Sequence, residues 1–109
     1  MTDMTFSQMA ASFSQATDDR LQDWIRARRN ELLALWAGHL LGKTGAALSE
    51  YARQITALRN SLSADSLIVR RIAEDLGAIG HHIDNAIVRA QLTRFQKQAW
   101  REFYPAAAA

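Results

Sequence analysis

Residues 27–37 decide the fold, and they read Ala27-Arg28-Arg29-Asn30-Glu31-Leu32-Leu33-Ala34-Leu35-Trp36-Ala37. Their apolar residues recur every three or four positions, which is the period of an amphipathic α-helix. The stripe extends beyond this segment in both directions and is broken only by Arg28; it contains Leu21, Trp24, Ile25, Leu32, Leu35, Trp36 and Leu40. We therefore predict a long helix that starts near Asp18 and Asp19, whose side chains suit an N-cap and a first turn, and ends at Gly42.

Gly38 lies inside this predicted helix, where Gly is about 1 kcal/mol less favourable than Ala. We therefore expect another helix to pack closely against it. Helical periodicity continues through the rest of the chain, whose only Pro is Pro105. The later helices are expected to start after the capping residues Thr44, Ser63 or Asp65, and Asp84.

Four helices joined by short links predict an all-α fold, in the form of an antiparallel four-helix bundle over residues 18–105. Gly80 and the two histidines after it are expected to form a linker. Ile83 and Val88 occupy the positions of a hydrophobic staple around the last N-cap. The Ala-rich residues 106–109 are expected to be a disordered tail.

A short amphipathic helix is predicted ahead of the bundle, from Thr5 to Ala16. Phe6, Met9 and Phe13 lie on one face, and the other face has almost no charge. A helix of this length is marginal in water by itself. We therefore expect residues 1–17 to be a mobile segment that becomes stable by docking, within its own domain or on a partner.

The composition excludes several kinds of chemistry. Among the 109 residues there is no Cys, which removes disulfides, thiolate zinc sites, iron–sulfur clusters and a cysteine nucleophile. The three histidines, His39, His81 and His82, fit no metal-ligand spacing, and no glycine-rich phosphate loop is present. The sequence therefore predicts no catalytic residue, no metal site and no cofactor, and a protein that is not an enzyme.

The distribution of charge and hydropathy bears on partners and location. The chain has 13 Lys and Arg against 11 Asp and Glu, and residues 1–25 hold four Asp and a single Arg. Arg26, Arg28 and Arg29 lie together but without interleaved aromatic residues, so no nucleic-acid partner is expected. The apolar run 32–41 is about half of the ~20 residues that a membrane helix needs. We expect a cytoplasmic protein that is not inserted in a membrane.

An aromatic cluster is predicted at the end of the last helix, where Trp100, Phe103 and Tyr104 are spaced at i, i+3 and i+4. Two interpretations stay open at this point. The three rings either pack on the open end of the bundle or form a contact between copies, since Trp and Tyr are common interface anchors. The second interpretation would suit a small helical scaffold or a self-associating interaction protein.

Residues 27–37 also resemble the signature of the zeta inhibitor subunit family of alphaproteobacterial F-type ATP synthases, in which the segment reads Ala-Arg-Arg-Asn-Lys-Leu-Leu-Gly-Leu-Trp-Ala. Leu-Gly follows there, as at Leu41 and Gly42 here. Smaller similarities are found at Gly45, Tyr51-Ala52, Asp75-Leu76, Gly80 and Ile83, so that the resemblance extends over residues 21–92. The N-terminal segment departs from the family pattern, since residues 6–10 are nearly free of charge where the family has Phe-Asp-Asp-Arg-Glu.

The resemblance implies a non-enzymatic regulatory subunit that binds the catalytic head of the synthase and inhibits ATP hydrolysis. In the family the N-terminal segment enters an α/β interface near the central rotor, becomes helical and blocks rotation in the hydrolytic direction. Its partners are thus the α/β and central-rotor subunits, and it lies peripherally at the inner membrane, while the free form is a monomer or weak homo-oligomer. The residues to which these roles are carried over are Phe6, Met9, Phe13, Asp18 and Asp19 for insertion, and Arg28, Arg29, Asn30 and Trp36 for holding the partner or the bundle.

Overall fold

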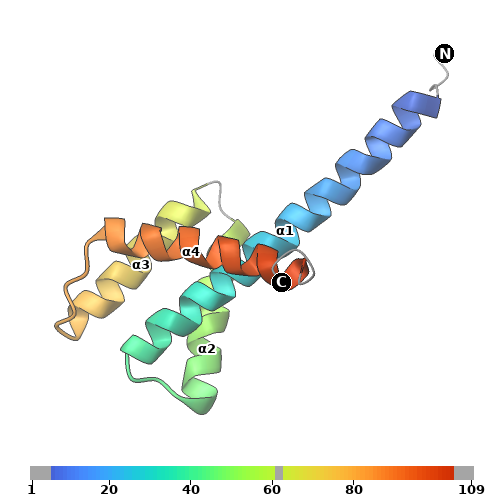
Figure 1. The fold of residues 1–109 in the computed structure, drawn as a ribbon. Coiled ribbons are helices and arrows are strands. Elements are labelled where there is room, and N and C mark those ends of the chain that lie inside the picture. Colours follow the sequence, from blue (N-terminus) through green and yellow to red (C-terminus); the bar gives the residue numbers. More distant parts are fainter. Residues whose placement is uncertain (1–5, 61–62, 105–109) are drawn as a thin grey trace.

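The computed structural model of the chain describes residues 6–60 and 63–104 and is all-helical over these ranges. It contains four α-helices and one 3-10 turn: α1 Phe6–Leu40, α2 Gly45–Thr56, η1 Ala57–Asn60, α3 Ala64–Ala78 and α4 Asn85–Phe103 (Figure 1). The predicted all-α class is therefore confirmed. The antiparallel order of a bundle stays a prediction, with which the contacts of α1 to α2 and α4, and of α3 to α4, are consistent.

α1 is one continuous helix of 35 residues, and this corrects the predicted break before Asp18. Asp18 and Asp19 lie in its interior and do not cap a second helix. The physical reason is that no Pro or Gly occurs between Phe6 and Ala37, and Asp inside a helix is less favourable than Ala by only about 0.7 kcal/mol. The free-energy cost of two such residues is too small to interrupt a helix that continues on both sides of them.

α1 ends before Gly42 as predicted, and Gly80 lies in the predicted linker between α3 and α4. Both glycines have a left-handed backbone, with φ of 76° and 87°. After α1, the Lys43 N–H donates to the Gly38 carbonyl at 2.9 Å and the Gly42 N–H to the His39 carbonyl at 3.0 Å. This is the Schellman pattern, which satisfies carbonyl groups that the last helical turn leaves open.

The predicted starts of α2, α3 and α4 hold, but among them only the N-cap of α4 makes a side-chain capping hydrogen bond. The Asp84 carboxylate caps α4 by accepting a hydrogen bond from the Ala86 N–H at 3.1 Å. Thr44 occupies the N-cap position of α2 in an extended conformation, but its hydroxyl makes no capping hydrogen bond. Ser63 immediately precedes α3.

The core lies where α2, α3 and α4 meet the C-terminal half of α1. Its fully buried large side chains come from all four helices and include Leu33, Ile55, Ile68, Ile72, Leu76 and Val88. Gly38 lies where α1 and α2 approach each other closely, since a Cβ built there would overlap Leu48 Cδ1 of α2. The predicted close packing at Gly38 is thus confirmed. No helix in the described part of the chain is long and apolar enough to cross a bilayer.

Candidate functional site

The first half of α1 projects away from the rest of the molecule (Figure 1). We call residues 6–20 the arm. The described side chains of the arm, from Thr17 to Arg20, are all exposed, and the first buried residue that follows is Ile25. Asp18 and Asp19 therefore present carboxylates to solvent. Phe6, Met9 and Phe13 belong to the helical backbone of the arm, but their side chains lie outside the described part of the structure.

Arg29 joins three helices at the base of the arm. Its side chain is 6% exposed, and its guanidinium donates to Asp65 Oδ1 of α3 at 2.7 Å and to Gln96 Oε1 of α4 at 3.2 Å. A third hydrogen bond, from Nε to Asn30 Oδ1, measures 3.1 Å. A buried guanidinium requires such acceptors because its charge is removed from water. In this structure Arg29 therefore holds α1 to α3 and α4, and a direct role in partner binding stays a prediction.

Arg28 makes a second tie, between α1 and the end of α4. Its Nε and Nη2 donate to the two carboxylate oxygens of Glu102 at 2.6 and 3.1 Å, and Nη1 donates to Glu31 at 2.8 Å. The hydrogen bond with Arg28 lowers the pKa of Glu102, and the same bond raises the pKa of Arg28. Paired planar groups of this kind fix orientation as well as distance, so α4 is held in register on α1.

We call the described residues from 21 to 104 the body. Tyr51, Asp75 and Trp36, which the resemblance also singled out, make contacts inside it. The Tyr51 hydroxyl donates to Asp75 Oδ2 at 2.8 Å, and Arg71 Nε donates to the same oxygen at 2.8 Å. Burial first, and then the Asp75 carboxylate, raise the pKa of Tyr51. Trp36 is half-buried and packs against the core cluster. These contacts stabilise α2 and α3 on the body.

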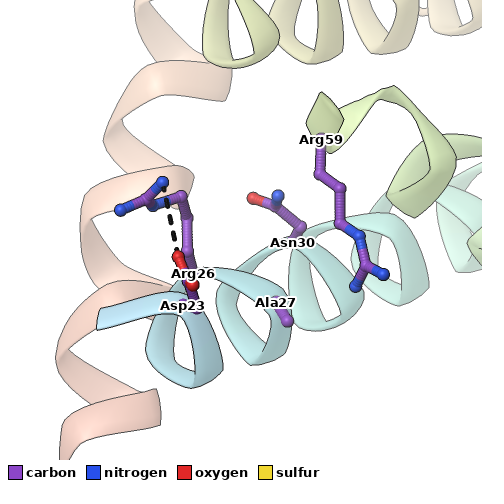
Figure 2. A pocket seen from close by; sticks show the side chains of 5 residues that line it. All are labelled: Asp23, Arg26, Ala27, Asn30 and Arg59. Carbon is purple, nitrogen blue, oxygen red and sulfur yellow. Dashed lines mark ion pairs between the residues drawn. The ribbon is translucent and has the colours of Figure 1, made fainter. Parts of the chain in front are cut away.

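A cavity of about 350 Å³ opens beside the base of the arm (Figure 2). Asp23, Arg26, Ala27 and Asn30 of α1 line it together with Arg59 of η1. Asp23 and Arg26 form an ion pair at 4.0 Å. The Asn30 side chain is 1% exposed, and its Nδ2 has no hydrogen-bond partner among the described residues. Hydrogen-bond donors from three side chains thus face this cavity beside one carboxylate.

Sequence reasoning did not place Arg59 at this cavity. Arg59 belongs to the short η1 turn, and the helical periodicity of the sequence did not distinguish this turn from α2. The turn at the end of α2 directs Arg59 back toward α1, and no periodic pattern signals it. The three histidines are all exposed, and no group of three potential metal ligands comes together within residues 6–60 and 63–104.

Four aromatic rings gather where the arm leaves the body. Trp24 of α1 and Phe103 of α4 have ring centroids 5.4 Å apart, Phe103 lies edge-on to Tyr104 at 4.7 Å, and Trp100 stacks on Tyr104 at 5.8 Å. Trp24, Phe103 and Tyr104 remain 44%, 43% and 46% exposed. Packing on the end of the body therefore covers Phe103 and Tyr104 only in part. Trp24 was not expected here, because helical spacing relates residues within one helix only.

Comparison with known proteins gives one family match. A family model described as ATPase inhibitor subunit zeta matches residues 1–102, which includes the arm, the body and all but the end of α4. No curated protein and no solved structure matches the chain. Since the family match covers nearly the whole chain, the protein belongs to the ATPase inhibitor subunit zeta family.

Proposed function

We propose that this protein binds the catalytic head of an F-type ATP synthase and inhibits ATP hydrolysis by inserting its N-terminal arm. The family supports an inhibitory role on an ATP synthase. The inserted element would be residues 1–17 with Phe6, Met9 and Phe13 as its apolar side chains, followed by Asp18 and Asp19. Its receptors would be the α/β subunits and the central rotor, which would place the protein peripherally at the inner membrane.

The observation that carries this proposal is the projecting arm. A helical extension that contributes no described residue to the core is not explained by the stability of the body. An amphipathic helix gains free energy when its apolar face enters a groove on a partner. Inhibition by such a wedge is steric, so it needs no catalytic residue and no cofactor.

The body would serve as the support of the arm. Arg28 and Arg29 fix the base of α1 to α3 and α4 through the contacts described above. The direction of the arm is therefore set by the body, and insertion would cost less conformational entropy than for a segment that has to fold first. A charge-poor arm would rely on apolar contacts more than on ion pairs.

The test is the inhibition of ATP hydrolysis by purified catalytic head. A variant with Phe6→Ser and Phe13→Ser should lose inhibition because both changes remove apolar surface from the arm. A variant that lacks residues 1–16 should behave in the same way and keep a cooperative thermal transition, because every described core residue lies from Ile25 onward.

Matched controls separate the arm from the body. Ser7→Ala changes the arm without removing an apolar side chain and should inhibit as the wild type does. The role assigned to the arm would be refuted by full inhibition from the protein that lacks residues 1–16. A wild-type protein that does not inhibit at all would refute the function as a whole.

A further inference from the structure

We propose that the exposed rings at the base of the arm form a second contact with the same partner that receives the arm. We call Trp24, Trp100, Phe103 and Tyr104 the aromatic patch. This inference rests on the proposed function and deepens it. It assigns to the patch a partner surface with an apolar centre and flanking carboxylates, located beside the groove that the arm enters.

The aromatic patch is an ordered surface and not a set of separate exposed residues. Its rings form a continuous series of contacts from α1 to α4 with centroid separations of 4.7–5.8 Å. The bidentate pair of Arg28 with Glu102 holds the end of α4 against α1 directly beside it. Aromatic side chains held in this way lose little conformational entropy on binding and are typical anchors of interfaces.

The position of the patch connects it with the arm. Positions 6 and 24 of α1 are separated by about five helical turns, so both lie on one side of the helix. Position 13 lies about three turns before Trp24, on the same side. A partner that contacts this side of the arm therefore meets the aromatic patch where the arm joins the body.

The charge next to the patch indicates the chemistry of the partner. Lys97 and Arg101 lie one turn apart on the exposed side of α4, adjacent in the helix to Trp100 and Tyr104. Neither has an ion-pair partner within the described ranges of the chain. Carboxylates on the partner would complement these two cations and would orient the docked body.

A second copy of the chain fits the same surface less well. A two-fold contact is self-complementary, so one centred on these rings would place Lys97 and Arg101 of both copies, four cations in all, in the same interface. Like charges that face each other across an interface disfavour the contact. A heterologous partner with carboxylates at the corresponding positions avoids this repulsion.

The test compares full-length variants by the concentration that gives half-maximal inhibition of purified catalytic head. Tyr104→Ala, and the double variant with Trp24→Ser and Tyr104→Ser, should raise this concentration about thirtyfold or more, while saturating protein still inhibits fully because the arm is intact. A variant with Lys97→Glu and Arg101→Glu should also raise it, and more strongly at low salt than at high salt. Ile87→Ala is the matched control, since Ile87 is 50% exposed near the other end of α4.

The outcomes separate the two proposals. If wild-type protein does not inhibit, the proposed function fails. If wild-type protein inhibits but both patch variants match Ile87→Ala, the aromatic patch has no role in docking and only this inference is overturned. It is also overturned if light scattering finds a wild-type dimer that Tyr104→Ala converts to a monomer with unchanged inhibition, because the patch would then bind a second copy.

The same set of variants distinguishes a loss of docking from a loss of folding. Trp24 contacts Phe103, so the double variant is assessed by its thermal transition before its inhibition is interpreted. Tyr104 follows the last residue of α4. Tyr104→Ala therefore leaves the helix intact and decides the question even if the double variant unfolds.

Discussion

At the scale of single residues, Gly38 and Gly77 offer a matched test of packing. Both lie in the last turns of helices, but a Cβ at Gly38 would overlap Leu48 Cδ1, whereas a Cβ at Gly77 would lie 3.7 Å from His82 Nδ1. Gly77→Ala should therefore stabilise the protein by about 0.5–1 kcal/mol in urea unfolding. Gly38→Val should destabilise it by about 2 kcal/mol, because the added methyl groups have to displace Leu48 and Tyr51. An equal gain from both substitutions would mean that α1 and α2 are not in close contact at Gly38.

Glu102 gives the structure a dependence on pH. Its hydrogen bond with Arg28 lowers its pKa in the folded protein below the usual value of 4.5. A carboxyl group with a lowered folded-state pKa contributes stability above its unfolded pKa and loses it as the pH falls through the folded value. The thermal midpoint of Glu102→Gln should therefore fall less between pH 5 and pH 3 than that of the wild type.

The control for this measurement is Glu74→Gln. Glu74 and Arg70 lie 3.8 Å apart and are both mostly exposed, so their pair should contribute little. This variant should show the same acid dependence as the wild type. An acid dependence of Glu102→Gln that is as steep as the wild type's would contradict the role of the Arg28 pair.

At the scale of elements, the continuity of α1 can be separated from the stability of the body. Asp19→Pro should kink or break the arm, since Pro removes a helical hydrogen bond and clashes with the preceding turn at a local cost of about 3 kcal/mol or more. The thermal midpoint of the body should change little because no described core residue precedes Ile25. Circular dichroism should report the lost helicity, and inhibition should weaken with it. Asp19→Ala keeps the helix and removes only the carboxylate, so it should weaken inhibition less than Asp19→Pro does. An equal loss from both variants would mean that the carboxylate, and not the continuity of the helix, carries the effect.

Helix ends were predictable from sequence where one residue decides the backbone. Gly42 adopts the left-handed conformation that ends α1, Gly80 adopts the same conformation in the predicted linker, and Asp84 supplies the capping oxygen of α4. The start of α1 was not predictable in this way. Asp18 and Asp19 are good caps only if the chain before them leaves the helix, and nothing between Phe6 and Ala37 makes it do so.

The candidate site was predictable only in part, for a related reason. The spacing within α4 identified Trp100, Phe103 and Tyr104 as one cluster, but their neighbour Trp24 is far away in the sequence. Likewise, the sequence marked Arg29 as part of a motif without indicating Asp65 as its acceptor. Contacts between helices depend on crossing geometry, and helical periodicity within one segment carries no information about it.

At the scale of the whole molecule, the arm determines the dimensions. The radius of gyration is 17.6 Å, and the principal extents are 61, 37 and 28 Å. A compact domain of this length would have a radius of gyration of about 13 Å. Small-angle X-ray scattering, extrapolated to low concentration to remove any self-association, should therefore give a value near 17.6 Å. A value near that of a compact domain would show that the arm folds back on the body.

Because α1 has no hinge between its tip and the core, it works as a lever. A sideways load on the tip is carried along the helix and concentrated at the first contacts that clamp it, namely Trp24 with Phe103 and Arg28 with Glu102. Under pulling in a force spectrometer, these clamps should therefore yield before the core does. The force that the protein withstands before it first yields would then be set by these two side-chain contacts and not by the size of its hydrophobic core.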